Sequence, residues 1–346
     1  MACSKPSGTF VLLDNDDTNI HFVNTVQESD SINIFDFENI YNGGGVGVGD
    51  FNNDGLQDLY FTGNMTANKL YLNKGDLRFE EVTAAAGVDG GGIWSRGISV
   101  IDINNDGLMD MYVCATAWKN PESRRNVLYI NKGVNKEGVP RFENEAAAYG
   151  LDDTTHTTMA YFFDYDRDHD LDVYLGVNHI LEHDYPNVYS PRTIDGTHPS
   201  TGRLYRNAYD STLKHPVFTD VSRQAGILYE GYTHAVNIFD ANLDGWPDIL
   251  EANDYISNNV LYINNRDGTF TDHTTDYFKH TALNAMGSDV IDLNNDGLDD
   301  LVEVDMAPQD NYRKKMFGPP INYTSYINSL MYGYQYQYIR NMVQAN

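Results

Sequence analysis

The sequence predicts an all-β fold of repeated four-stranded sheets, and three observations carry that prediction. A nine-residue acidic pattern returns five times, beginning at positions 50, 102, 164, 240 and 292. Short stretches of alternating apolar, aromatic and β-branched residues flank each copy, and two more such stretches follow it. Glycine and asparagine separate these stretches, as is typical between strands. Four predicted strands in a unit that repeats every 52 to 76 residues indicate one blade of a β-propeller.

The strands of a unit have recognisable sequences. The first two lie directly before and after the acidic pattern, as residues 46–49 and 59–61 do in the first unit. The third has the form Leu-Tyr-x-Asn, and the fourth begins with a phenylalanine. The third strand is expected at residues 70–73, 128–131, 204–207 and 261–264, and the fourth at Phe79, Phe142 and Phe218.

The repeats divide the chain into blades. We expect four complete blades at residues 42–90, 91–152, 153–228 and 229–280, with an insertion at 178–203 in the third. Residues 281–346 form an incomplete fifth blade with an insertion at 306–338. Within it, residues 341–346 match the third strand at 68–73.

The N-terminal segment, residues 1–41, is expected to contain a closing strand. Residues 9–13 resemble a fourth strand that has no blade before it. This strand would complete either the fifth blade or a blade beyond residue 346. We favour the second, a fragment of a larger propeller of about seven blades; a closed five-bladed ring is the alternative.

The acidic pattern has the spacing of a cation-binding loop. Asp or Asn stands at positions 1, 3, 5 and 9, and a turn residue stands at position 6. Side chains 1, 3 and 5 can converge, the carbonyl of residue 7 can join them, and the ninth Asp closes the shell. Such oxygen ligands suit Ca²⁺, so we expect about five ions. The predicted ligands are Asp50, Asn52, Asp54, Leu56, Asp58, Asp102, Asn104, Asp106, Leu108, Asp110, Asp164, Asp166, Asp168, Asp170, Asp172, Asp240, Asn242, Asp244, Trp246, Asp248, Asp292, Asn294, Asp296, Leu298 and Asp300.

Two details qualify the pattern. His169 replaces the usual glycine in the third loop, so that loop is expected to carry strain and to bind more weakly, which an extra carboxylate partly offsets. Glu251 and Glu303 stand at the twelfth position of the fourth and fifth loops, as in an EF-hand. The flanks are short and strand-like, whereas an EF-hand needs helices, so we reject that interpretation.

Composition limits the function. The net charge is −27 and the isoelectric point about 4.4, which excludes a nucleic-acid partner because phosphates would be repelled. A hydrophobic content of 41% and an aromatic content of 12% argue against disorder. The loops hold many of the acidic residues, so their carboxylates should repel one another strongly in the metal-free protein.

The two cysteines form no disulfide framework. Cys114 lies in a predicted strand and is expected to be a buried small hydrophobe. The sequence around Cys3 is similar to the cut end of a bacterial lipoprotein precursor, so we expect an outer-membrane or cell-surface lipoprotein, or a secreted protein. The alternative, given equal weight, is that Cys3 is unmodified and has no function. A lipid anchor at Cys3 would be the membrane contact, since no apolar run is long enough to span a bilayer.

These motifs resemble those of FG-GAP/VCBS repeat proteins with an integrin-α-like propeller. The sequence of residues 42–55 and 70–75 is similar to that of the N-terminal part of Bacteroidetes lipoproteins that also carry an ASPIC/UnbV segment. The resemblance covers nearly the whole chain. It implies a Ca²⁺-stabilised propeller at the cell surface or outside the cell, but it implies no particular ligand.

The resemblance also places a ligand face. In integrin-like propellers the Ca²⁺ loops join the innermost strand to the second at one face, so the starts of the inner strands lie at the opposite face. Aromatic and hydrogen-bonding residues there could contact glycan or peptide; the alternative is that they plug the channel. The candidates are Asn42, Trp94, Arg96, Trp118, His156, Tyr232, His234 and Asn284.

The leading hypothesis is a non-catalytic binding or adhesion module that contacts glycan or protein, with no catalytic residues and with Ca²⁺ as a structural ion. The alternative enzyme is a Ca²⁺-dependent polysaccharide lyase in which His156, His234 and Arg96 would act on a uronate. A third hypothesis is a purely structural propeller that serves a downstream domain.

Overall fold

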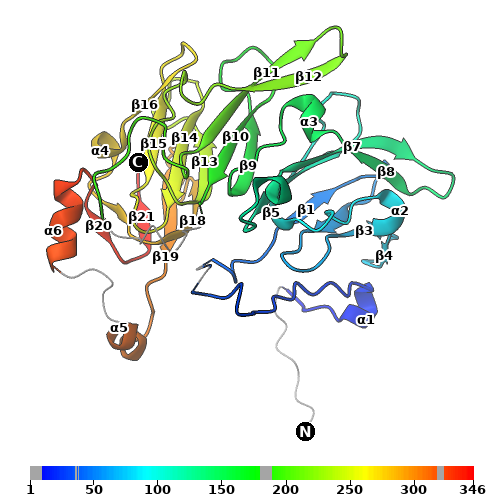
Figure 1. The fold of residues 1–346 in the computed structure, drawn as a ribbon, viewed down its shortest axis with the longest axis horizontal. Coiled ribbons are helices and arrows are strands. Elements are labelled where there is room, and N and C mark those ends of the chain that lie inside the picture. The colour runs from blue at the N-terminus through cyan, green and yellow to red at the C-terminus, as the bar shows by residue number, and fades with distance from the viewer. Residues whose placement is uncertain (1–9, 36, 38, 180–188, 318–322) are drawn as a thin grey trace.

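Five antiparallel sheets follow one another along the chain in a computed structural model that describes residues 10–35, 37, 39–179, 189–317 and 323–346 (Figure 1). The chain is an all-β propeller in which four sheets have four strands in sequential order. Blade 1 holds β1 (Val46–Gly49), β2 (Asp58–Phe61), β3 (Lys69–Asn73) and β4 (Phe79–Glu81). Blade 2 holds β5 (Trp94–Ile101), β6 (Asp110–Thr116), β7 (Val127–Val134) and β8 (Pro140–Asn144).

The remaining blades repeat this order. Blade 3 holds β9 (Thr157–Phe163), β10 (Asp172–Val177), β11 (Arg203–Asp210) and β12 (His215–Asp220). Blade 4 holds β13 (Thr233–Phe239), β14 (Asp248–Asn253), β15 (Val260–Asn264) and β16 (Phe270–Asp272). Blade 5 is a three-stranded sheet of β18 (Ala285–Ile291), β19 (Asp300–Asp305) and β21 (Met342–Gln344), and β17 (Thr281–Ala282) pairs in parallel with β20 (Gln337–Tyr338).

The first strand of each blade lies against the first strand of the next. β5 contacts both β1 and β9, and β13 contacts both β9 and β18, so the blades form a continuous arc (Figure 1). The second strands β6, β10 and β14 are buried at every residue, because neighbouring blades cover both of their faces. Residues that alternate along these strands therefore enter two different cores, one on each side of a blade.

Short helices connect the blades. Three single-turn helices follow the fourth strands of blades 1, 2 and 4, and α2 and α3 end at left-handed glycines, Gly87 and Gly150. The helices are α1 (Asn15–Thr18), α2 (Thr83–Ala86), α3 (Ala146–Tyr149), α4 (Thr274–Tyr277), α5 (Asn311–Phe317) and α6 (Tyr323–Met331), with a 3₁₀ turn at Pro121–Arg124. None of the helices in the described ranges is both long and apolar enough to cross a bilayer.

The N-terminal segment differs from the expectation. Residues 10–13 form no strand, and Phe10 and Leu12 are exposed, so no closing strand lies within the described part of residues 1–41. The chain instead runs along blade 1. Phe22 stacks on Phe61 with ring centroids 5.2 Å apart, and Asn24 donates a hydrogen bond of 2.7 Å to Asn64. Side-chain contacts, with no strand pairing, attach this segment to the propeller.

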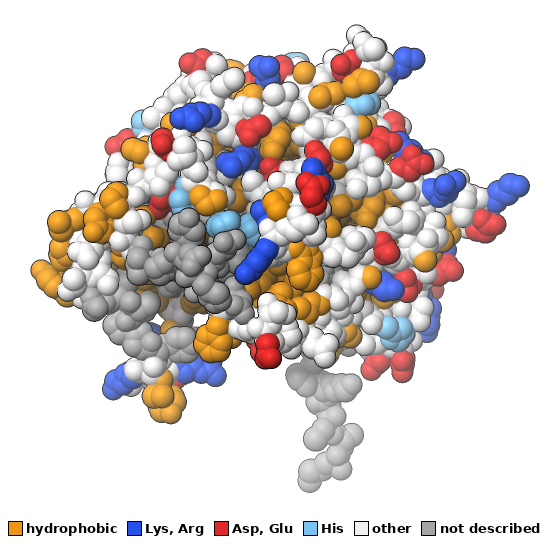
Figure 2. Space-filling model, in the orientation of Figure 1, with side chains coloured by type: hydrophobic (Ala, Val, Ile, Leu, Met, Phe, Trp, Pro, Cys, Tyr) orange, Lys and Arg blue, Asp and Glu red, His pale blue; other side chains and the backbone are white. Residues whose placement is uncertain are grey.

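The C-terminal segment contains the expected third strand of blade 5. Residues 342–344 pair with β19, and the side-chain oxygen of Asn341 accepts from the Asp305 amide at 2.8 Å. Asn68 accepts in the same way from Gly63 at 2.8 Å in blade 1. Hydrophobic side chains are exposed over α5 and α6 at the edge of the molecule (Figure 2).

Candidate metal sites in the five Asp loops

Each acidic loop joins the first strand of its blade to the second. The first loop, residues 50–58, leaves β1 at Gly49 and enters β2 at Asp58, and the other four have the same place. All five loops therefore lie at one end of the inner strands. The starts of those strands lie at the opposite end, as the topology requires.

The first Asp of a loop organises its backbone. Both carboxylate oxygens of Asp50 accept hydrogen bonds, from the amides of Asp54 at 3.0 Å and Gly55 at 2.8 Å. The same pair of bonds recurs at Asp102, Asp240 and Asp292. These bonds wrap the loop round its first residue and bring positions 1, 3 and 5 together.

The ninth Asp ties the loop to the third strand. Asp58 is fully buried, and its two oxygens accept from the amides of Phe51 at 3.0 Å and Asn73 at 2.8 Å. Asn73 is the last residue of the Leu-Tyr-x-Asn strand. The same two bonds recur at Asp110, Asp172, Asp248 and Asp300, whose third-strand partners are Asn131, Asn207, Asn264 and Asn346.

Burial raises the pKa of these ninth carboxyls above the ordinary range. The pKa is raised to about 6 at Asp58 and Asp248, to about 7 at Asp110 and to about 8 at Asp172, and desolvation is the largest cause at each. Neighbouring loop carboxylates add to the shift. A bound cation would oppose both effects, so these acids fit a site that is complete only with a positive charge.

Two backbone positions in every loop adopt positive φ. Position 6 is glycine in four loops, and in the third His169 adopts a φ of +76°. Position 4 also has positive φ, which the sequence analysis missed, although asparagine occupies it in three copies, as Asn53, Asn105 and Asn295. Asparagine tolerates this conformation better than most residues, and this preference is the signal that could have found the position.

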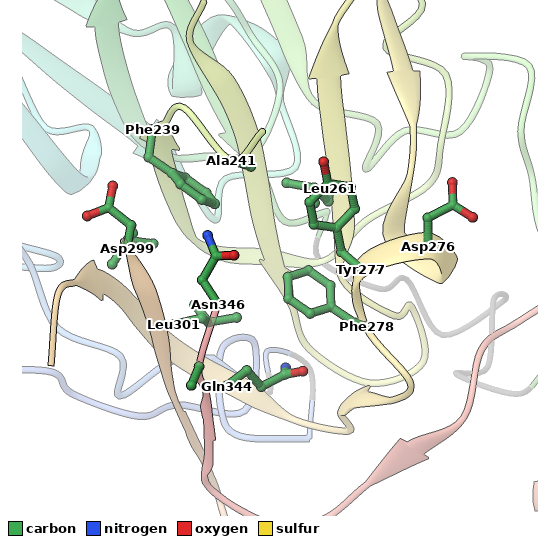
Figure 3. A pocket seen from close by; sticks show the side chains of 12 residues that line it. Phe239, Ala241, Leu261, Asp276, Tyr277, Phe278, Asp299, Leu301, Gln344 and Asn346 are labelled. Atoms are coloured by element: carbon green, nitrogen blue, oxygen red, sulfur yellow. The ribbon is translucent and has the colours of Figure 1, made fainter. Parts of the chain in front are cut away.

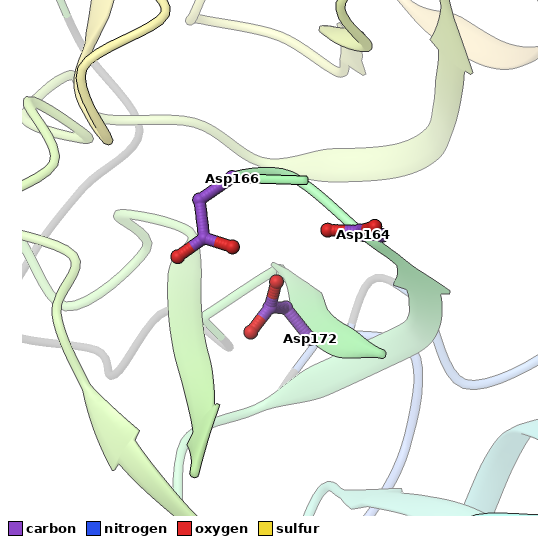
Figure 4. Close-up of side chains that lie close together, drawn as sticks. All are labelled: Asp164, Asp166 and Asp172. Atoms are coloured by element: carbon purple, nitrogen blue, oxygen red, sulfur yellow. The ribbon is translucent and has the colours of Figure 1, made fainter. Parts of the chain in front are cut away.

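The third loop has the densest group of carboxylates. Oxygens of Asp164, Asp166 and Asp172 all lie within 4.8 Å of one another (Figure 4). One oxygen of Asp164 and one of Asp170 are buried without a hydrogen-bond partner. The loop also lacks the amide bond from position 5 to position 1, because the Asp168 amide reaches only Asp166 at 3.3 Å. Crowded acids with free oxygens fit a hard cation such as Ca²⁺.

Asparagines connect the loops to neighbouring blades. The side chain of Asn131 in blade 2 donates to the carbonyl of Phe51 in the first loop at 2.9 Å. Asn264 in blade 4 donates in the same way to Tyr165 in the third loop at 2.8 Å. A change in one loop therefore acts directly on the packing of the next blade.

The expected ligand face is largely covered. Trp94 is fully buried, because Phe37 of the N-terminal segment packs on it with ring centroids 5.4 Å apart and Trp118 packs at 6.0 Å. Tyr232 is 8% exposed and packs with Ile256 and Tyr334. Segments remote in sequence thus cover the rings of Trp94 and Tyr232, and neither ring is open to a ligand in this structure.

The other candidates on this face are mostly enclosed as well. Arg96, His156 and Asn284 are buried, Trp118 is half-buried and Asn42 is exposed. Burial lowers the pKa of His156 to about 3, with smaller contributions from Arg124 and His179. The side chain of His234 is 6% exposed and lies 3.3 Å from Asp254. The three lyase candidates Arg96, His156 and His234 are thus enclosed, which disfavours their use as catalytic residues.

Of the histidines at the 178–203 insertion, His179 lies against His156 with ring centroids 4.9 Å apart. His183 and Cys3 lie outside the described residues. Cys114 is fully buried, and burial raises the pKa of its thiol, which fits an inert core residue.

A family model of the FG-GAP-like repeat matches residues 50–113 and 240–303. The chain therefore contains FG-GAP-like repeats. Each match begins at the first Asp of one loop and extends past the next loop, so the two matches contain the first, second, fourth and fifth loops. The third loop, with His169, lies between the matched FG-GAP-like segments.

Curated relatives match over a limited length. Cartilage acidic protein 1 of Xenopus tropicalis is 30% identical over 138 residues, which is 39% of this chain and 20% of the relative. The human protein of the same name is 29% identical over 136 residues. This chain thus spans about a fifth of the length of these relatives.

The matches among solved structures are distant ones. They include a lectin from Agrocybe aegerita that recognises non-reducing terminal N-acetylglucosamine, at 16% identity and a TM-score of 0.30, covering 75% of this chain and 73% of the lectin. The GH32 β-fructofuranosidase BmSUC1 of Bombyx mori has 12% identity and a TM-score of 0.36, over 75% and 55%. The biofilm matrix protein Bap1 of V. cholerae has 10% identity and a TM-score of 0.31, over 75% and 59%. Similarity at this level carries no argument about function.

The packing of the blades leaves a hollow between blades 4 and 5. In two earlier interfaces the second residue of a loop packs on a fourth-strand phenylalanine of the next blade, as Phe51 does on Phe142 at 6.0 Å. Ala241 occupies that place in the fourth loop. A cavity of about 310 Å³ lies beside it, lined by Phe239, Tyr277, Phe278 and residues 344–346 (Figure 3).

Proposed function

We propose that this chain is a calcium-stabilised, non-catalytic binding module of the bacterial cell surface that contacts glycan or protein through the face opposite the Asp loops. The observation that carries the proposal is the repeated loop, in which the ninth Asp makes the same two bonds in all five blades and the first Asp makes its two amide bonds in four of them. The third loop adds three carboxylates within 4.8 Å and two free buried oxygens. About five Ca²⁺ ions would neutralise ten of the 27 excess negative charges.

Calcium would act as a structural ion. Each loop connects the first and second strands, and its ninth Asp reaches the third strand, so a bound ion stabilises three strands at once. The asparagine bonds from Asn131 and Asn264 extend this effect to the next blade. Ca²⁺ binding to the folded state alone stabilises it by mass action.

The contact surface that we propose consists of the segments that cover the face opposite the loops. The insertion after β19 leaves and returns at this end of blade 5 and exposes several tyrosines, among them Tyr323 at 80% and Tyr336 at 50%. Aromatic rings on a connection over a rigid scaffold suit glycan or protein contact. The lipoprotein-like sequence around Cys3 supports the proposed location at the cell surface.

The test is binding of the purified chain to glycan arrays and to extracellular-matrix proteins, in Ca²⁺ and in EDTA. We expect binding in Ca²⁺ with no chemical change in the bound molecule. The double variant Tyr323→Ala/Tyr336→Ala should lose binding while its melting temperature stays the same. Tyr209→Ala, which removes an exposed ring at the loop end of blade 3, is the matched control. Unsaturated sugar products, or equal binding by the double variant, would contradict the proposal.

A further inference from the structure

Glu251 and Glu303 share one position in their blades but have no place in the Asp loops. Each stands three residues after the ninth Asp of its loop, within β14 or β19, and each is fully buried. Their side chains reach the preceding blade, away from the loop. Glu251 accepts a hydrogen bond of 2.7 Å from the hydroxyl of Tyr174, and Glu303 accepts one of 2.6 Å from the amide of Asn259.

Each glutamate uses only one oxygen in these bonds. The second oxygen of Glu251 and of Glu303 is buried and has no hydrogen-bond partner among the described residues. Isolated buried charges are costly, so buried carboxylates are paired with a cation, coordinate a metal or become protonated. The two glutamates differ in the charges around them.

Burial raises the pKa of both carboxyls to about 7. At Glu251 the positive charge of Arg192 opposes this shift. At Glu303 the charged neighbour is Asp305, a second carboxylate, which adds to it. The two acids lie two residues apart on β19 and are both buried, so they face the same side of the strand.

Asp305 repeats the arrangement of Glu303. One of its oxygens accepts from the amides of Leu283 at 3.0 Å and Asn284 at 3.1 Å, and the other is buried without a partner among the residues that the structure describes. Neither acid forms a salt bridge within the described ranges. Two carboxylate oxygens without counter-charge thus lie at the interface of blades 4 and 5.

Neutral oxygens without partners lie in the same region. Thr281, on β17, is opposite Gln337 of β20 in the parallel pair, and β17 contacts β19. Gln337 also donates to the carbonyl of Ser257 at 3.0 Å. The hydroxyls of Thr281 and Ser257 and the side-chain carbonyl of Gln337 are buried and have no hydrogen-bond partner in the described part of the chain. With Glu303 and Asp305 of β19, five buried oxygen atoms without a partner among the described residues therefore lie on β17, β19, β20 and the Ser257 residue that Gln337 contacts, and two of the five are acidic.

We propose that Glu303 and Asp305 hold a hard divalent cation, Ca²⁺ by its ligand chemistry, at the interface of blades 4 and 5 and at the end opposite the Asp loops, with Thr281, Ser257 and Gln337 as neutral oxygen ligands. An all-oxygen set with two carboxylates suits Ca²⁺ better than metals that favour nitrogen or sulfur. The ion would connect β19 to β17 and β20, and so attach the tyrosine-bearing insertion to the propeller.

The test is the number of Ca²⁺ ions retained per chain after equilibrium dialysis, measured by inductively coupled plasma mass spectrometry. Glu303→Gln should retain one ion fewer than wild type. Glu251→Gln changes the same position of the preceding blade, where Arg192 supplies positive charge, and should retain the wild-type number. Failure of the Asp loops to bind would lower the total in all three proteins alike, so the difference between them tests this site alone.

Equal counts in wild type and Glu303→Gln would overturn the proposal and leave a protonated acid pair. If Glu303→Gln does not fold, Thr281→Val keeps the shape and charge of the site and should weaken the affinity for one ion. Crystals of the unaltered protein grown with terbium in place of Ca²⁺ give a direct answer. An anomalous peak bound by Glu303 and Asp305 supports the site, and a water molecule at that position overturns it.

Discussion

The side-chain amide of Asn131 in blade 2 donates a hydrogen bond of 2.9 Å to the carbonyl of Phe51, inside the first Asp loop of blade 1. The backbone amide of the same asparagine donates at 2.7 Å to Asp110, the ninth Asp of its own loop. One buried residue thus connects two loops and two blades. The conformation of the Asp loops and the packing of the blades are therefore coupled in this protein.

Asn131→Ala should destabilise the protein more than Asn73→Ala. Both asparagines cap the same turn in their blades, but the side chain of Asn73 donates only within its own blade, to Gln57 at 3.0 Å. The alanine at position 131 leaves the buried Phe51 carbonyl without its partner, which costs about 1–3 kcal/mol. Urea unfolding in Ca²⁺ measures the difference, and equal unfolding free energies would show that the bond between blades contributes nothing.

His169→Gly should stabilise the third loop. His169 adopts a φ of +76°, a conformation that glycine reaches without strain, and its side chain is 93% exposed, so little packing is lost. We expect a gain of up to about 1 kcal/mol and tighter Ca²⁺ binding by this loop. Gly107→Ala, the reverse change in the second loop with no atom near the added methyl group, should lose about as much. A fall in melting temperature for His169→Gly would contradict the strain argument.

Gly202→Ala should destabilise the interface of blades 3 and 4. An added Cβ would lie 2.2 Å from the hydroxyl oxygen of Tyr174 and 2.8 Å from a carboxylate oxygen of Glu251. Such overpacking costs about 1–3 kcal/mol. Tyr174→Phe removes the hydroxyl and should partly rescue the variant in a double-mutant cycle. Gly287→Ala, whose nearest contact would be 3.6 Å, is the control and should be almost neutral.

Glu251→Gln should flatten the pH dependence of stability between pH 4.5 and about pH 7. Burial raises the pKa of Glu251 in the folded state to about 7, against a reference value of 4.5. The folded state therefore binds more protons than the unfolded state in this window, and the contribution of Glu251 to the unfolding free energy falls as pH rises to 7. The difference between variant and wild type should change by on the order of 3 kcal/mol. Parallel stability curves in saturating Ca²⁺ would show that Glu251 titrates normally.

The sequence predicted the blades and loops because both are local and periodic. Ligand spacing within nine residues and alternation within a strand depend only on neighbours in sequence. The residues next to Asp50 are therefore enough to predict its loop, and those next to Leu70 are enough to predict its strand. The turn at position 4 of each loop was missed, since Leu243 and Arg167 hide the preference that Asn53 displays.

Contacts between distant segments carry no such period. Phe37 precedes blade 1 in the sequence and packs on Trp94, the first residue of β5 in blade 2. A ring expected at the ligand face is therefore buried. The space beside Gly202 is filled by Tyr174 and by Glu251 of the next blade. The sequence near Gly202 gives no sign of this contact with Glu251. Residues 10–13, where part of a closing strand was expected, form no strand in the structure, because local strand propensity does not supply a partner edge.

If Ca²⁺ holds the propeller together, the melting temperature must differ between EDTA and millimolar Ca²⁺, and Mg²⁺ serves as the control. A site saturated a hundredfold above its Kd contributes about 2.7 kcal/mol, so several sites should raise the Tm by more than about 10 °C. Mg²⁺ should give a much smaller rise, because it demands a tighter octahedral shell. An unchanged Tm in Ca²⁺ would contradict the account.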